Sequence, residues 1–131
     1  MRRLRLKVLA ERFAVCRLPP SAPIPPRPSV CGLWSVTITD RELSLVLPEA
    51  AAPTGYPMEW GWRSLEVAGP LDLSLTGVMA SLSGPLAAAG VSVFVVSTYD
   101  TDWVLVQEKD LATATRVLRA AGHVVEDLAT P

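Results

Sequence analysis

The sequence has few of the side chains that metal sites and disulfides use. It contains two cysteines and one histidine among 131 residues, and Cys16 and Cys31 belong to no Cys-x-x-Cys motif or Cys/His cluster. Zinc sites and disulfide frameworks need several such residues at characteristic spacings. We therefore expect no metal site and no disulfide, and we predict that both cysteines are buried, reduced thiols of a cytoplasmic protein.

An excess of charge of one sign is also lacking. Lysine and arginine number 12, aspartate and glutamate 13, and the formal net charge is -1. A protein that binds a phosphate backbone needs a basic patch, so nucleic acid is not an expected partner. No apolar segment is long enough to cross a bilayer. The basic start, Met1–Lys7, alternates charged and apolar residues as a strand does, so we expect neither a signal peptide nor a membrane partner.

Motifs for phosphate binding and nucleophilic catalysis are missing as well. The glycines match neither a Walker loop nor a dinucleotide fingerprint. His123 is the one histidine available as a base, and it lies far in the pattern from any candidate serine or cysteine. Asp100 and Asp102 resemble cation ligands, but no third acid completes a calcium loop. We predict that the protein is not an enzyme and has no cofactor, and that His123 is a structural or simply an exposed residue.

About half of the residues are apolar, which is ample for a packed core. The first segment, Leu4–Leu18, alternates apolar and polar residues and predicts one long or broken strand. The prolines of Pro19–Pro28 remove backbone donors and exclude a regular helix. Such a stretch is either a rigid crossover or a ligand for an SH3-like domain, and in a chain of this length we favour the crossover.

Two short apolar runs follow the proline-rich stretch. The pair Trp34–Thr39 and Leu43–Leu47 predicts a hairpin, because turn-forming residues separate two segments rich in β-branched side chains. Thr39 and Glu42 also fit a capping box, which would allow one helical turn at the hairpin tip. Pro48–Gly61 is predicted to be a linker to a second compact unit.

The second half begins with a strand and a helix. Arg63–Ala68 alternates like a half-buried strand. Asp72 or Ser74 is predicted to cap the helix, Pro85 interrupts it and Gly90 ends it in a left-handed conformation. Apolar residues recur at helical spacing along this segment: Leu75, Val78, Met79, Leu82 and Leu86.

The rest of the second half repeats this alternation. Val91–Ser97 is almost continuously apolar and predicts a central strand, which pairs with Asp102–Val106 as a hairpin. A second helix then ends at Gly122, and His123–Glu126 forms the last strand. The apolar face of that helix consists of Leu111, Ala114, Val117, Leu118 and Ala121. The order predicts an α+β, ferredoxin-like βαββαβ unit with two helices on one face of an antiparallel sheet.

Two segments of this unit have the composition of a ligand site. Gly69–Gly77 leads into the first helix, where free backbone N–H groups carry partial positive charge and can dock a carboxylate. Ser97–Asp102 brings hydroxyls, the Tyr99 ring and the carboxylates of Asp100 and Asp102 to a strand end, as an ammonium or guanidinium group requires. Together they suit a zwitterion. The alternative is that these are ordinary turn residues, bonded to their own backbone.

The sequence also resembles bacterial ACT-domain proteins related to the CASTOR arginine sensors. The likeness runs from about Lys7 to Glu126 and includes the segments Leu9–Leu18, Gly69–Asp72 and Val96–Trp103. Its most specific part is a Ser-Thr-aromatic-x-x-Asp motif, met as Ser97, Thr98, Tyr99 and Asp102.

The resemblance implies a pair of ACT units and an amino-acid ligand held at an ACT–ACT interface. We also expect a homodimer, because an edge strand of such a sheet exposes unpaired backbone groups that a second copy would cover. Residues 1–57 would form a degenerate, strand-rich first unit and residues 58–131 a full ACT domain. By resemblance, Thr98, Tyr99 and Asp102 match the arginine-sensor site, and Leu75, Thr76 and Gly77 lie near the helix start that often faces ligand. The implied function is a non-catalytic sensor or regulatory module. The alternative is a structural or protein-interaction module that has lost its ligand.

Overall fold

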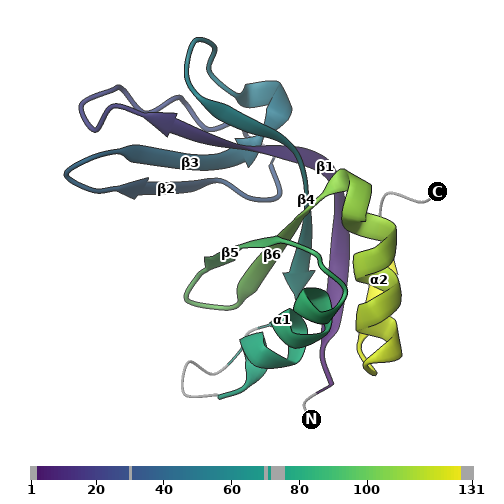
Figure 1. The fold of residues 1–131 in the computed structure, drawn as a ribbon. Coiled ribbons are helices and arrows are strands. Elements are labelled where there is room, and N and C mark those ends of the chain that lie inside the picture. Colours follow the sequence, from purple (N-terminus) through teal and green to yellow (C-terminus); the bar gives the residue numbers. More distant parts are fainter. Residues whose placement is uncertain (1–2, 30, 70, 72–75, 128–131) are drawn as a thin grey trace. The chain divides into compact units, whose positions relative to one another are not determined.

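The computed structural model describes residues 3–29, 31–69, 71 and 76–127 (Figure 1). The described strands are β1 (Arg5–Leu18), β2 (Ser35–Ile38), β3 (Leu43–Pro48), β4 (Met58–Val67), β5 (Val93–Ser97), β6 (Asp102–Gln107) and β7 (Val124–Asp127). The helices are α1 (Val78–Ala88) and α2 (Leu111–Ala120), with 3-10 turns η1 (Glu49–Ala51) and η2 (Glu108–Asp110). None of the described helices is long and apolar enough to cross a membrane.

The chain forms two compact units that share two strands. One unit comprises Met1–Ala10 and Arg63–Pro131, and the other comprises Glu11–Trp62. These bounds differ from the predicted division into 1–57 and 58–131, because β1 and β4 each run from one unit into the other. Composition marks the end of a linker, but it does not show that a strand continues through the boundary.

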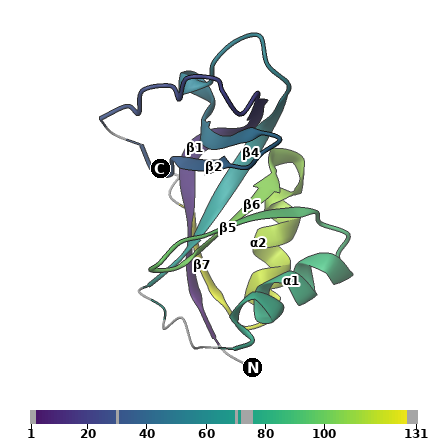
Figure 2. The same ribbon diagram turned by 90° about the vertical axis from the view of Figure 1, so that its left-hand side faces the viewer.

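The larger unit has the predicted order of strand, helix, strand, strand, helix and strand. Its strands pair in the order β7-β1-β4-β6-β5. The first half of β1 lies between β7 and β4 and pairs with β7 in parallel, Arg5 opposite Val124 (Figure 2). The sequence pattern made no prediction for this pair, because it placed the N-terminal strand in the first unit. The N-terminal strand enters a unit that the sequence pattern assigned to the second half alone.

The prediction of a central strand over Val91–Ser97 is also wrong. β5 is the last strand of the described sheet, paired with β6 from Val93–Val106 to Ser97–Asp102. Its side chains are half-buried or exposed, and Val95 is 37 % exposed. A run of β-branched residues is equally typical of a central strand and of an edge strand with one covered face, so hydrophobicity did not separate them.

The helices bury their apolar faces in the core of the larger unit. Val78, Leu82 and Leu86 of α1 are buried, spaced one turn apart. Gly90 and Gly122 follow α1 and α2 with φ of 75° and 99°, which confirms the predicted left-handed ends. The same core includes Leu4, which precedes β1, and residues of the strands: Leu6, Val8, Leu65, Val67, Val104, Val106 and Val125.

The buried side chain of His123 bonds to the carbonyl that Pro85 leaves without its helical partner. Proline lacks the N–H that would donate to the carbonyl four residues earlier, which is that of Ser81. His123 Nε2 lies 3.0 Å from that carbonyl oxygen, and the Leu4 N–H donates to His123 Nδ1 at 3.1 Å. Because Nδ1 accepts, the ring proton belongs on Nε2, where it donates to Ser81. Of the two roles expected for His123, structural or exposed, the structure shows the structural one, because the side chain is buried and makes both bonds.

The smaller unit is built almost entirely of strands. Its order is β2-β3-β1-β4, and β2 and β3 form the predicted hairpin. Thr39 Oγ1 accepts from the N–H groups of Arg41 and Glu42, both at 3.2 Å, so the threonine closes a tight turn. The helical turn that the capping box would allow at this tip does not form. The described residues of Glu11–Trp62 contain no α-helix, in agreement with a degenerate first unit.

Both units repeat one topology. In each, a long strand is followed by a hairpin, and the second strand of that hairpin pairs with the long strand: β3 with β1, and β6 with β4. The predicted linker over Pro48–Gly61 ends earlier than expected, because β4 already begins at Met58. Gly61 has a φ of 77° within β4, and its N–H donates to Glu49 at 2.6 Å. The repeat supports two related units in tandem.

Candidate functional site

The predicted ligand residues Ser97–Asp102 form the tip of the β5–β6 hairpin. Ser97 and Asp102 are its terminal pair, and Ser97 Oγ donates to Asp102 Oδ1 at 2.7 Å. The Thr98 N–H donates to the Thr101 carbonyl at 2.8 Å, and the Thr101 N–H donates to Thr98 Oγ1 at 3.3 Å. These bonds hold the loop in one shape and fix the direction of the Asp102 carboxylate.

The charged and aromatic groups of this tip differ in exposure. Asp102 is half-buried, and its bond to Ser97 occupies one carboxylate oxygen, leaving the second for another donor. Asp100 is exposed, and 82 % of Tyr99 is exposed. Carboxylates and an aromatic face at one strand end are suited to a cationic group.

The second predicted segment meets the first through residues that the sequence analysis had not singled out. The Leu71 N–H donates to the Asp100 carbonyl at 2.6 Å, and Thr101 Oγ1 donates to the Val67 carbonyl, also at 2.6 Å. Thr101 is buried despite its position in a turn. The end of β4 is therefore joined to the hairpin tip. A glycine directly after a strand is the sequence signal for such an approach, and Gly69 occupies that position.

The remaining predicted residues follow Leu71 in the sequence. Leu75 and the expected helix caps Asp72 and Ser74 lie outside the described residues. Thr76 and Gly77 are exposed where α1 begins, and Gly77 has a φ of 78° at the N-cap. The structure thus brings Gly69 and Leu71 to the hairpin tip, but it gives no contact between that tip and Thr76 or Gly77.

We predict that Gly69→Ala separates these two segments. A Cβ at Gly69 would lie 2.9 Å from the Asp100 carbonyl oxygen and 3.1 Å from Thr101 Cβ, so the backbone must shift. Overpacking of this kind costs about 1 to 3 kcal/mol of unfolding free energy. Gly84→Ala is the matched control, because its Cβ meets nothing within 4 Å and helix propensity improves. Urea denaturation that showed equal stabilities for the two variants would contradict the close approach.

The two cysteines differ in access. Cys16 is buried as predicted, whereas Cys31 is half-buried. Burial raises the pKa of the Cys16 thiol above its ordinary value. Because the thiolate is the reactive form, we predict that a thiol-specific reagent modifies Cys31 first and Cys16 only on unfolding. Mass spectrometry of the partly modified native protein tests this, and early label on Cys16 would refute it.

Among the described residues, no three His, Cys, Asp or Glu side chains gather as metal ligands.

Comparison with known proteins identifies the family. Residues 58–120 match the model of an ACT domain. The cytosolic arginine sensor for mTORC1 subunit 1 of Bos taurus is 33 % identical over 104 residues, covering 71 % of this chain and 32 % of the sensor. This chain therefore spans about a third of the length of that relative.

Solved structures agree with this assignment. Protein Atu0741 of Agobacterium tumefaciens is 35 % identical, with a TM-score of 0.88 over 97 % of this chain and 95 % of that one. The regulatory subunit of aspartate kinase from Thermus thermophilus, 9 % identical, shares the fold with a TM-score of 0.61 over 89 % of this chain and 96 % of that one. The chain belongs to the ACT-domain proteins and is related to the cytosolic arginine sensors.

Proposed function

We propose that this protein is a non-catalytic regulatory module that binds an amino acid at the β5–β6 hairpin tip. The observation that carries the proposal is the bond from Ser97 to Asp102, which orients a half-buried carboxylate on the hairpin tip that also presents the exposed Tyr99 ring. A cationic group placed there gains a charge-assisted hydrogen bond and an aromatic face. Thr98 and Asp100 complete the polar rim.

The carboxylate end of the ligand needs a separate partner. In the proposed complex it lies toward Thr76 and Gly77, where the first N–H groups of α1 have no partner within the helix. Leu75 is the third residue that the resemblance assigns to this side. Arginine is the first ligand to test, because the relatives are named as arginine sensors and a guanidinium group suits two carboxylates.

The proposed module acts as a homodimer in the cytoplasm. β5 leaves backbone groups unpaired along the outer side of the described sheet, and association with a second copy would cover them. A cytoplasmic location follows the relatives, which are named as cytosolic. Sedimentation that showed a monomer at high micromolar concentration would refute the dimer.

A thermal-shift screen over the twenty amino acids tests the ligand proposal. A ligand that binds only the folded state adds about 2.7 kcal/mol of stability at a hundredfold excess over its Kd. We expect a concentration-dependent rise in Tm with arginine or another amino acid. D-enantiomers are the matched control, because an oriented zwitterion site distinguishes them.

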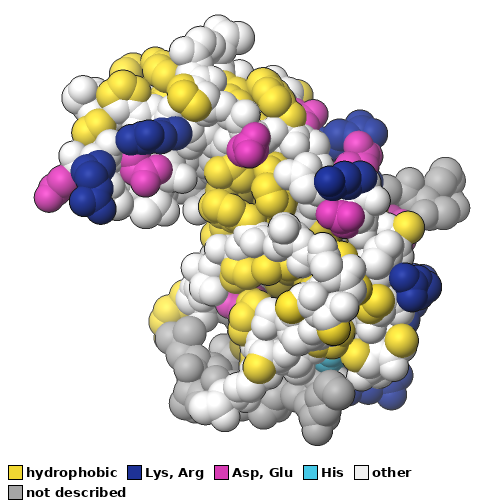
Figure 3. Space-filling model, viewed as in Figure 1, with side chains coloured by type: hydrophobic (Ala, Val, Ile, Leu, Met, Phe, Trp, Pro, Cys, Tyr) yellow, Lys and Arg dark blue, Asp and Glu magenta, His cyan; other side chains and the backbone are white. Residues whose placement is uncertain are grey.

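The second candidate is an interaction module without an amino-acid ligand. Exposed apolar side chains favour it, since Ile38 of β2 is 58 % exposed and Trp60 of β4 is 53 % exposed. Figure 3 shows hydrophobic side chains at the surface of both units. Exposed tryptophan is typical of protein interfaces. No rise in Tm with any amino acid would favour this candidate over the first.

A further inference from the structure

A groove on the outer side of α2 lies apart from the residues of the hairpin tip. Its volume is about 480 Å³. It is open to solvent and lined by Leu111, Ala112, Thr115, Arg116, Arg119 and Asp127. The five helical residues follow one face of α2, because they recur three or four positions apart. The opposite face holds Ala114 and Leu118 in the core.

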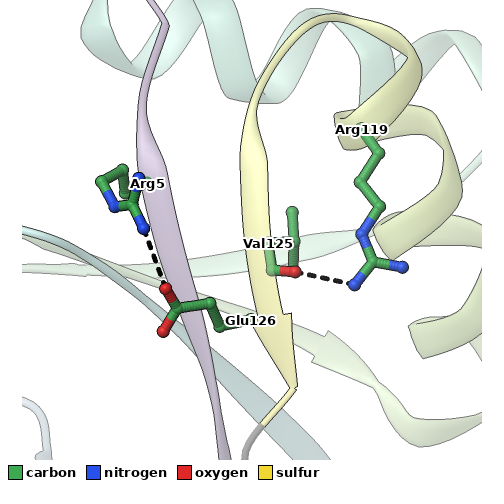
Figure 4. Close-up of polar contacts among 4 residues, drawn as sticks. All are labelled: Arg5, Arg119, Val125 and Glu126. Carbon is green, nitrogen blue, oxygen red and sulfur yellow. Dashed lines mark hydrogen bonds and ion pairs between the residues drawn. The ribbon is translucent and has the colours of Figure 1, made fainter.

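Arg119 is held in position by β7. Its Nη2 donates to the Val125 carbonyl at 2.7 Å, reaching from the helix to the strand (Figure 4). A guanidinium group has five N–H donors in one plane, so this bond leaves others for a ligand. The bond to Val125 fixes the orientation of that plane. Because the fold already holds the guanidinium group of Arg119 in one orientation, this side chain loses little further conformational entropy when a ligand binds.

The charges around the groove are unbalanced. Arg116 forms no hydrogen bond or ion pair with the described part of the chain. The neighbouring acids are already engaged: Glu126 pairs with Arg5 at 3.0 Å, and Asp127 has an interaction within the chain. The groove therefore presents two arginines, one turn apart, beside an apolar floor of Leu111 and Ala112.

We propose that this groove binds an acidic peptide segment of a partner protein, with carboxylates on Arg116 and Arg119 and an apolar side chain on Leu111 and Ala112. Recognition of acidic motifs by paired arginines is a recurring mode. A small carboxylate alone does not suffice, because ion pairs at exposed arginines contribute little in water. A peptide adds burial of the apolar floor, and its backbone spans both arginines.

NMR titration of the full chain with a capped pentapeptide of alternating leucine and glutamate tests the proposal. We expect saturating shifts confined to α2 and β7, and binding about tenfold weaker for the matched peptide of leucine and glutamine. Arg116→Gln should weaken the acidic peptide about two- to fivefold, as the loss of one exposed ion pair does, and Ala112→Glu about tenfold, because it also adds a repelling carboxylate to the apolar floor. Both positions are exposed and neither holds the fold.

Arg41→Gln is the matched control, since Arg41 is exposed in the other unit and outside the groove. It should bind the acidic peptide as the parent does. Absence of shifts in α2 and β7, or equal affinity of Arg116→Gln and the parent, would overturn the proposal. Equal competition by free glutamate at the same concentration would also overturn it, by assigning the groove to a small carboxylate.

Discussion

Asp102→Asn is expected to weaken binding of a cationic amino acid by about 30-fold or more. The substitution keeps an oxygen that accepts from Ser97 Oγ, so the hairpin tip retains its shape. It removes the charge that faces the ligand cation, and loss of one member of a desolvated charged pair costs about 2 to 5 kcal/mol. The half-buried position of Asp102 places the loss near the lower figure, which corresponds to about 30-fold in Kd. Isothermal titration calorimetry with the amino acid found by the thermal screen measures it.

Asp100→Asn is the matched control for this experiment. Asp100 is exposed, and an exposed ion pair contributes about 0.2 to 1 kcal/mol, so its loss should change Kd by less than tenfold. Circular dichroism should show equal folding for both variants. Unchanged affinity in Asp102→Asn would remove Asp102 from the site and leave it a turn residue bonded to Ser97.

His123→Ala is expected to lower the free energy of unfolding by about 2 to 5 kcal/mol. The variant loses two buried hydrogen bonds and leaves the Leu4 N–H and the Ser81 carbonyl without a partner. Each buried unsatisfied group costs about 1 to 3 kcal/mol. His123→Asn should lose less, because its side-chain oxygen can take the place of Nδ1 opposite Leu4. Urea denaturation of the three proteins gives the values.

The double variant with Pro85→Ala isolates the bond to Ser81. An alanine at position 85 regains the N–H that the helix lacks, and the natural acceptor for it is the Ser81 carbonyl. The gain in stability from Pro85→Ala should be larger in the His123→Ala background than in the parent protein. Equal gains in the two backgrounds would show that His123 does not compensate for the proline.

Helix periodicity and glycine positions were enough to predict the order of elements in the larger unit. Gly90 and Gly122 mark both helix ends because only a residue without Cβ takes a positive φ there cheaply. The pairing partner of each strand could not be predicted in the same way. Arg5 pairs with Val124 across almost the whole chain, and local patterns carry no signal for such distant pairing.

In the candidate site, too, the sequence showed local chemistry but not contacts between distant segments. The side chains of Ser97, Tyr99 and Asp102 could be proposed from the sequence because their chemistry is explicit there. The contact of Leu71 with Asp100, and the burial of Thr101, were not found because they depend on backbone groups and on close approach. Gly69 gave the one local hint, since a glycine after a strand permits a neighbouring backbone to come close.

The shared strand β1 has a consequence for synthesis on the ribosome. Leu4 and His123 are 119 positions apart and bond directly, and Leu6 and Val8 complete a core with residues of β4, α2 and β7. The apolar side chains at the start of β1 therefore gain their full set of core partners only after β7 has emerged from the exit tunnel. A long interval between the synthesis of β1 and that of β7 favours association with other chains and slow, late folding. Chaperone demand during translation should accordingly be greater for this protein than for an ACT domain assembled from one continuous segment.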